Sequence, residues 1–189
     1  MRVRTAMAMI GTVALVAAVG TTGAAQADRG SGSRGGGGSE TIEIEDDCDP
    51  ETFNVAVAPG TCVGDGDTEF EEFINELLDE GEADKCRNHP DDTHVDEGER
   101  VKLKNVGGEA HTFTRVDAFG GGCVPELNAV LGLAPAPDAV CGAAFAGVLL
   151  PGQSATVPAT DLHEGHNLFQ CMIHPWMHAE IEVRGHDHH

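Results

Sequence analysis

The second half of the chain consists of short apolar segments separated by glycine and proline turns. From Thr93 onward, apolar and polar residues alternate at Val101–Lys104 and again at His111–Val116, and a period of two is typical of a strand with one buried face. Residues 118–142 interrupt this pattern with three consecutive glycines and several prolines, which favours a long crossing loop with a short helix near 126–131. Many short strands predict an all-β sandwich or barrel of antiparallel strands. The remaining expected strands are 144–150, 154–158, 167–171 and 179–183.

A helical segment precedes these strands. Apolar side chains recur at helical spacing through residues 68–80, after Thr68 and Glu71 in a capping-box pattern and before Gly81. We therefore expect an amphipathic helix at 68–80. It belongs to a Cys-containing section at 48–90 that packs on the main domain.

The first residues have the three-part layout of a secretory signal. Arg2 and Arg4 precede an almost unbroken apolar run, and Ala25–Ala27 supplies the small residues of a cleavage site. The apolar run is too short to span a bilayer comfortably, which disfavours an uncleaved anchor. We therefore expect a signal peptide at 1–27 and export, extracellular or periplasmic, into an oxidising compartment where disulfides persist.

A Gly/Ser-rich, acidic linker is expected to follow at residues 28–47, because its composition offers little to bury. Its last part, residues 40–47, is either a short edge strand or the end of this tail, since Ile42 and Ile44 alternate with acidic residues.

Charge and composition narrow the classes of function. The chain has 32 acidic and 11 basic residues, for a formal net charge of -21, which disfavours nucleic acid or an anionic membrane surface as a partner. Loss of Arg2 and Arg4 with the signal would bring the charge from -21 to -23. Ten histidines and six cysteines in 189 residues point to metal binding, disulfides or both.

The segment from Phe169 to Met177 contains the strongest candidates for metal ligands. Cys171, His174 and Met177 follow one another at intervals of three residues, so a strand that turns sharply after Cys171 brings a thiolate, an imidazole and a thioether together. This soft donor set suits copper. Hard cations would need carboxylates, and structural zinc would need four strong Cys or His donors.

A trigonal copper site needs a second imidazole, and His111 is the best candidate. It opens an alternating segment 60 residues before Cys171. The predicted ligands are therefore His111, Cys171 and His174, with Met177 as a weak axial ligand. The alternatives left open are that Cys171 joins a disulfide, that His111 is a satisfied strand-edge residue, and that Met177 only fills the core.

At these residues the chain resembles the cupredoxins, the small blue copper proteins. The resemblance rests on Cys171-x-x-His174-x-x-Met177 followed by an alternating strand and preceded by the isolated His111. It covers residues 93–184, within a predicted domain at 91–184. It implies a Greek-key β-sandwich, here with a small helical N-terminal extension, and a type 1 copper centre.

Three features depart from the resemblance. Thr112 stands where many members carry asparagine, although its hydroxyl can still tie the two ligand segments together. His178 is a competing donor, and residues 48–90 exceed a minimal cupredoxin. A His-rich tail at 185–189 ends the chain.

If Cys171 binds the metal, five cysteines remain. They can form two disulfide bridges and leave one free thiol. Cys48–Cys62 is the first expected pair, and Cys123–Cys141 would staple the long loop, leaving Cys86 unpaired. Sequence alone does not fix this connectivity.

The resemblance implies a non-enzymatic carrier of single electrons with one copper per chain. The uncharged segment around His174 and Trp176 predicts a docking patch for a redox protein. We expect this partner to be basic, because the rest of the chain is acidic and would attract it. We expect a monomer without membrane insertion. One alternative is an exported copper carrier or buffer with the same ligands, and another is a metal-free cupredoxin-fold binding module in which Cys171 is bridged.

Overall fold

The computed structural model describes residues 39–158 and 161–185. The expected signal peptide at 1–27, the first part of the expected linker and nearly all of the His-rich tail lie outside these residues. Within the described part, no helix combines the length and apolar character needed to cross a membrane.

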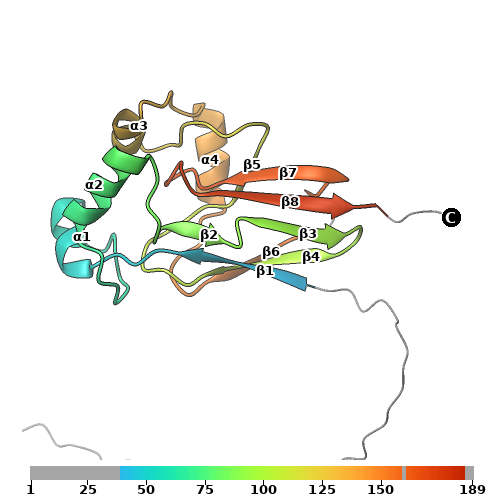
Figure 1. Cartoon of the computed structure of the whole chain (residues 1–189), viewed down its shortest axis with the longest axis horizontal. Helices are drawn as coiled ribbons and strands as arrows, with labels where there is room; N and C mark the ends of the chain where they lie inside the picture. The colour runs from blue at the N-terminus through green and yellow to red at the C-terminus, as the bar shows by residue number, and fades with distance from the viewer. Residues whose placement is uncertain (1–38, 159–160, 186–189) are drawn as a thin grey trace, which may run out of the picture. The chain divides into compact units, whose positions relative to one another are not determined.

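Two four-stranded sheets form the body of the protein (Figure 1). The first contains β2 (Arg87–His89), β1 (Ser39–Glu45), β4 (Arg100–Asn105) and β6 (Ser154–Val157), in that order, and the second contains β3 (Asp92–Asp96), β8 (His178–Arg184), β7 (Gly165–Gln170) and β5 (Thr114–Val116). Strands β6, β7 and β8 confirm the predicted strands at 154–158, 167–171 and 179–183 to within two residues.

Each sheet is mixed, because it contains one parallel pair. These pairs are β1 with β4 and β3 with β8, whereas all other neighbours are antiparallel. The expectation of purely antiparallel strands is therefore wrong. Long connections separate both parallel pairs in the sequence, so the chain can return and pair in the same direction.

One hydrophobic cluster receives side chains from both sheets. Ile42 and Leu103 come from the first sheet, and Phe169, Ile181 and Val183 come from the second. Alternate residues of these strands are buried, as a period of two requires. The cluster fixes how the sheets face each other and so fixes the segments that connect them.

Strand β1 corrects the expected linker boundary at residue 47. It pairs with β2 on one side and with β4 on the other, and Ile42 and Ile44 are fully buried. Residues 39–45 are therefore an internal strand, neither an edge strand nor a tail. The alternation of isoleucines indicates a strand, but only pairing partners distant in the sequence decide its place in the sheet.

Two helices lie between β1 and β2, so the helical section is an insertion within the strand order rather than an N-terminal extension. Helix α1 spans Pro50–Ala56, and Asp49 caps it by accepting hydrogen bonds from two amides of the first turn. Helix α2 spans Phe70–Glu80 and ends at Gly81, which has a φ of 80°.

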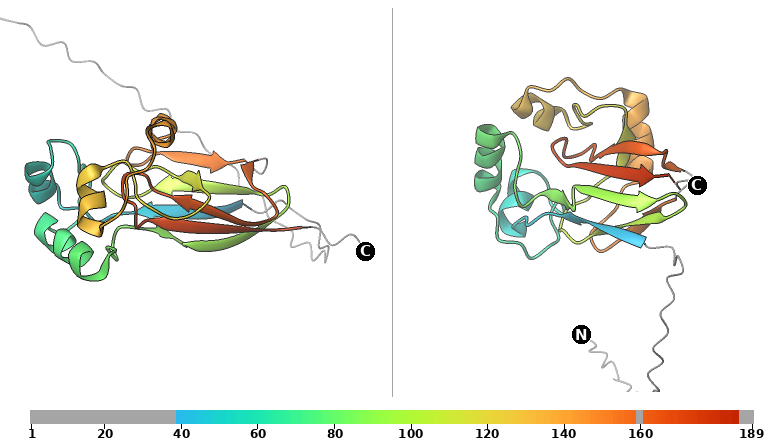
Figure 2. Two further views of the ribbon diagram at one scale, coloured as in Figure 1. Left: turned by 90° about the horizontal axis from the view of Figure 1, so that it is seen from above. Right: turned by 45° about the vertical axis from the view of Figure 1, so that its right-hand side comes forward.

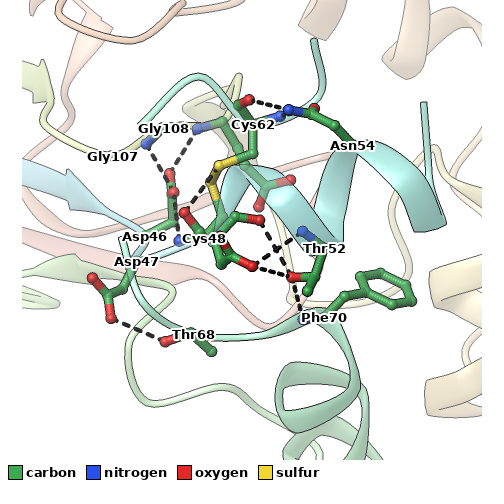
Figure 3. Close-up of a disulfide and its surroundings, with 12 residues drawn as sticks. Asp46, Asp47, Cys48, Thr52, Asn54, Cys62, Thr68, Phe70, Gly107 and Gly108 are labelled. Atoms are coloured by element: carbon green, nitrogen blue, oxygen red, sulfur yellow. Dashed lines mark hydrogen bonds between the residues drawn. A yellow bond between two sulfur atoms is a disulfide. The ribbon is translucent and has the colours of Figure 1, made fainter. Parts of the chain in front are cut away.

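The predicted capping box of α2 is not formed. Glu69 is the N-cap residue and makes no side-chain cap, whereas the Thr68 hydroxyl donates to Asp47. The Thr52 hydroxyl of α1 instead accepts from the amide of Phe70 (Figure 3). The two helices are thus joined at their N-terminal turns, which a pattern confined to α2 does not reveal.

Helices also occupy the long crossing segment. Helix α3 (Pro125–Leu131) confirms the short helix expected near 126–131. The strand predicted at 144–150 is not formed: α4 (Asp138–Ala146) takes its first three residues, and Leu149 makes only an isolated bridge with His111. An alanine-rich segment that begins directly after Pro137 favours a helix. Helices α1, α2 and α3 gather at one end of the two sheets (Figures 1 and 2).

The disulfide pattern agrees with the sequence expectation. Cys48–Cys62 and Cys123–Cys141 are bonded, and Cys86 is a free, buried thiol. Figure 3 shows the first bridge beside the turn at Gly107 and Gly108. This bridge ties the helical insertion to the end of β1.

Candidate metal centre

Two connections between strands supply the candidate ligands. Cys171, His174 and Met177 lie on the connection between β7 and β8, and His111 lies on the connection between β4 and β5. His111 is held by two backbone hydrogen bonds with Leu149, at 3.0 and 2.7 Å. The connection between β7 and β8 is closed by the Cys171 amide donating to the Met177 carbonyl at 2.9 Å.

Three of the four predicted ligands meet at one point. Cys171 Sγ lies 3.9 Å from His111 Nδ1 and 3.8 Å from His174 Nδ1, and the two Nδ1 atoms are 3.1 Å apart. Ligands bound at about 2.0–2.3 Å to one ion have spacings of this size. All three residues are buried, with exposures of 0%, 0% and 4% for His111, Cys171 and His174. Two imidazoles and a thiolate fit copper.

Met177 lies beside this group, and its axial role stays a prediction. The side chain is buried, and its Sδ is 3.5 Å from Cys86 Sγ. His178 is turned to other contacts, since its ring stacks on Phe119 with centroids 3.8 Å apart. Burial lowers the pKa of His178.

Backbone donors surround the Cys171 sulfur. The amides of Thr112 and His174 each lie 3.4 Å from Sγ and point at it. The Thr112 hydroxyl accepts from the Met172 amide at 2.7 Å, so it ties the two ligand segments together, as its position in the sequence suggested. Such donors hold the sulfur in place and tune its electron density.

Asp46 orients His111, and sequence reasoning missed it. Its buried carboxylate accepts from His111 Nε2 at 2.8 Å and from the amides of Gly108 and Glu109 at 2.8 and 3.0 Å. These contacts leave Nδ1 free to face Cys171. A Cβ on Gly107 would overlap the Asp46 carboxylate, so the turn there requires glycine. The one sequence signal was an acidic residue directly after the alternating isoleucines.

The triad is electrostatically paired even without a metal. Burial raises the pKa of Cys171, but hydrogen bonds and charge from both histidines outweigh it and hold the pKa well below its usual range. Burial lowers the pKa of His111, but Asp46 and Cys171 outweigh it and raise this pKa to about 9. Burial likewise raises the pKa of Asp46, and its hydrogen bond with His111 brings it below the ordinary value.

The predicted exposed docking patch is not formed. His174 and Trp176 are only 4% and 8% exposed. The Trp176 indole donates to the Cys86 carbonyl at 2.9 Å, and the ring of Phe73 from α2 packs on it with centroids 5.6 Å apart. The apolar segment was expected to be a surface, but the helical insertion covers it. A groove of about 530 Å³ between α2 and α3 still reaches the His174 side chain.

Comparison of the structure with solved structures finds cupredoxins. A purple cupredoxin from Nitrosopumilus maritimus is 15% identical, with a TM-score of 0.40, over 76% of this chain and 98% of that chain. A plastocyanin from Dryopteris crassirhizoma is 18% identical, with a TM-score of 0.35, over 76% and 99%. A mutant amicyanin in the Cu(I) state is 17% identical, with a TM-score of 0.34, over 53% and 75%. The chain is similar to cupredoxins.

Sequence comparisons add nothing to this result, since no model of a known protein family matches the chain and a search of curated proteins finds no match.

Proposed function

We propose that this protein is an exported type 1 copper protein that shuttles single electrons. His111, Cys171 and His174 would hold one copper ion, with Met177 as a weak fourth ligand. The observation that carries this proposal is the buried triad, whose ligand atoms lie within 4.8 Å of one another although they come from two distant segments. Bound copper would supply the Cu(I)/Cu(II) couple.

The surroundings of the triad suit electron transfer because they resist rearrangement. Asp46 holds His111, two amides hold the Cys171 sulfur, and Thr112 joins the two ligand segments. A site that keeps its geometry in both oxidation states needs little reorganisation when an electron arrives or leaves. We infer that the two sheets frame it as a Greek-key sandwich, which the shared hydrophobic cluster supports.

The depth of the site favours an electron shuttle over a copper carrier. A carrier passes its ion through ligand exchange with another protein, and this needs an accessible thiolate. Cys171 is fully buried, and His174 is covered by the helical insertion. Copper should therefore remain bound through repeated cycles of reduction and reoxidation, whereas a carrier would release it to a Cu(I) chelator on reduction.

The metal-free alternative required Cys171 in a disulfide, and the structure contradicts it. Cys171 is a free thiol, and the two bridges use Cys48, Cys62, Cys123 and Cys141. The two disulfides support residence in an oxidising compartment. A carrier without enzymatic activity is the role that this donor set suits best.

A basic redox protein remains the proposed partner, because the chain carries a net charge of -21. Its approach cannot use an exposed His174 ring. The groove that reaches His174, lined by Phe53, Phe73 and Leu127 among others, offers a route inward. The transfer rate should fall as salt screens the attraction.

The test is addition of Cu(II) to the purified protein, followed by visible spectroscopy. We expect an intense thiolate-to-copper band that disappears in Cys171→Ser. Cys86→Ser is the matched control, because Cys86 is the other buried free thiol, and it should keep the band. A colourless wild-type protein, or a band that survives Cys171→Ser, would refute the proposal.

A further inference from the structure

A second group of metal-ligating side chains lies next to the copper triad. Cys86, Glu109 and His174 are all buried, and they offer ligand atoms within 4.8 Å of one another. Neither Cys86 nor Glu109 has a role in the copper site proposed above. A buried thiol and a buried carboxylate that converge on one imidazole require an explanation of their own.

His174 presents a different nitrogen to each group. Its Nδ1 faces the triad, 3.1 Å from His111 Nδ1, and its Nε2 lies 3.6 Å from Glu109 Oε2. A separation of 3.6 Å is too long for a good hydrogen bond. It is the spacing of a nitrogen and an oxygen that share one ion at about 2.0–2.2 Å.

The Glu109 carboxylate has one ion-pair neighbour in the described part of the chain. Its side chain is 8% exposed, and its contact with His174 is the one ion pair it makes within the described residues. No donor in that part of the chain gives it a hydrogen bond, although the Glu109 backbone is bonded to Asp46 and Asn105. A buried carboxylate without hydrogen bonds is stabilised either by taking up a proton or by a cation beside it.

The cavity nearest to this group does not define the ion position. It has a volume of about 10 Å³ and is lined by Cys86 and Glu109, but not by His174. The three converging donors therefore carry the inference.

We propose that Cys86, Glu109 and His174 bind a second transition-metal ion, bridged to the copper site by the His174 imidazole. Thiolate, carboxylate and imidazole are donors for Zn²⁺ or Co²⁺, and three protein ligands leave one position for water. Binding forms bonds to Sγ, Oε2 and Nε2, and the thiol proton and the Nε2 proton leave to solvent. The inference rests on the proposed copper function only through the shared His174.

The test uses Co(II), because its visible bands report thiolate binding. The purified protein, with His186, His188 and His189 replaced by alanine to remove adventitious binding by the tail, is loaded with one equivalent of Cu(II). Co(II) is then titrated in, and the metal content is measured after gel filtration. We expect a second equivalent to bind, with cobalt d–d bands and a thiolate-to-cobalt band.

Two variants assign the second ion to its ligands. Cys86→Ser should abolish the cobalt band, and both Cys86→Ser and Glu109→Gln should reduce the metal content from two ions to one while keeping the blue copper band. Glu109→Gln covers the case in which Cys86→Ser fails to fold. The proposal is overturned if the protein that keeps Cys86, Glu109 and His174 binds only one ion. It is also overturned if either folded variant still binds two ions. A blue band without a second ion refutes this inference alone, and a cobalt band without a blue band refutes only the copper proposal.

Discussion

Replacing Asp46 by asparagine tests how the protein tunes the proposed copper centre. Oδ2 of Asp46 accepts from His111 Nε2 at 2.8 Å and from the Glu109 amide at 3.0 Å, while Oδ1 accepts from the Gly108 amide. Asparagine has nearly the same shape, but it has one oxygen. Its NH₂ group would face two donors or one, depending on its orientation, and the negative charge next to His111 would be lost.

The expected magnitudes follow from these contacts. Breaking a buried charged pair costs about 3–5 kcal/mol, so the metal-free variant should lose about this much free energy of unfolding. Groups that hydrogen-bond a ligating histidine typically contribute about 10- to 100-fold to metal affinity. The carboxylate makes His111 a stronger donor, which stabilises Cu(II) more than Cu(I). A loss confined to Cu(II) would raise the reduction potential by about 60–120 mV, at 59 mV per tenfold.

The assay is spectroelectrochemical titration of the copper-loaded variant, with urea unfolding of the metal-free form alongside. Asp47→Asn is the matched control: it makes the same change one residue further on, at a carboxylate that contacts Lys85 and Thr68. Its potential should stay close to that of the wild type. The reasoning is refuted if the potential of Asp46→Asn falls, or if it shifts no more than that of Asp47→Asn.

Three other predictions follow from the same site and its frame. Thr112→Val removes the hydroxyl that accepts an amide hydrogen bond from the second ligand segment, so urea unfolding should show a loss of about 1–3 kcal/mol, with Thr112→Ser near wild type. Gly108→Ala would bring a Cβ within 2.6 Å of backbone atoms, so it should lower the free energy of unfolding by at least about 1–3 kcal/mol. Gly142→Ala in α4 is the control, because a Cβ there meets nothing within 4 Å. In thermal melts it should raise the stability by about 0.5–1 kcal/mol. His111 has a pKa of about 9 and Cys171 a pKa well below its usual range, so at pH 7 the pair holds one proton, on His111. Calorimetry in two buffers should therefore show that one proton is released for each Cu(II) bound. The affinity for Cu(II) should rise with pH up to about 9. Uptake without proton release would contradict this protonation state.

Local patterns in the sequence determined a large part of this protein. The spacing of Cys171, His174 and Met177 on one short connection, with His111 as the added imidazole, predicted the residues of the triad. The alternation in β7 and β8 predicted strands, and the helical spacing before Gly81 predicted α2. These features are local, because side-chain periodicity and ligand spacing are set by neighbours a few residues apart.

Only the tertiary structure decided what surrounds the triad. Asp46 reaches His111 across 65 residues of sequence, because β1 lies inside a sheet rather than in a tail. Glu109 and Cys86 converge on His174, and the helical insertion buries the apolar segment that the sequence suggested as a surface. Each of these outcomes depends on strand pairing and packing between segments far apart in the chain, and such long-range contacts leave no periodic signal in the residues that make them.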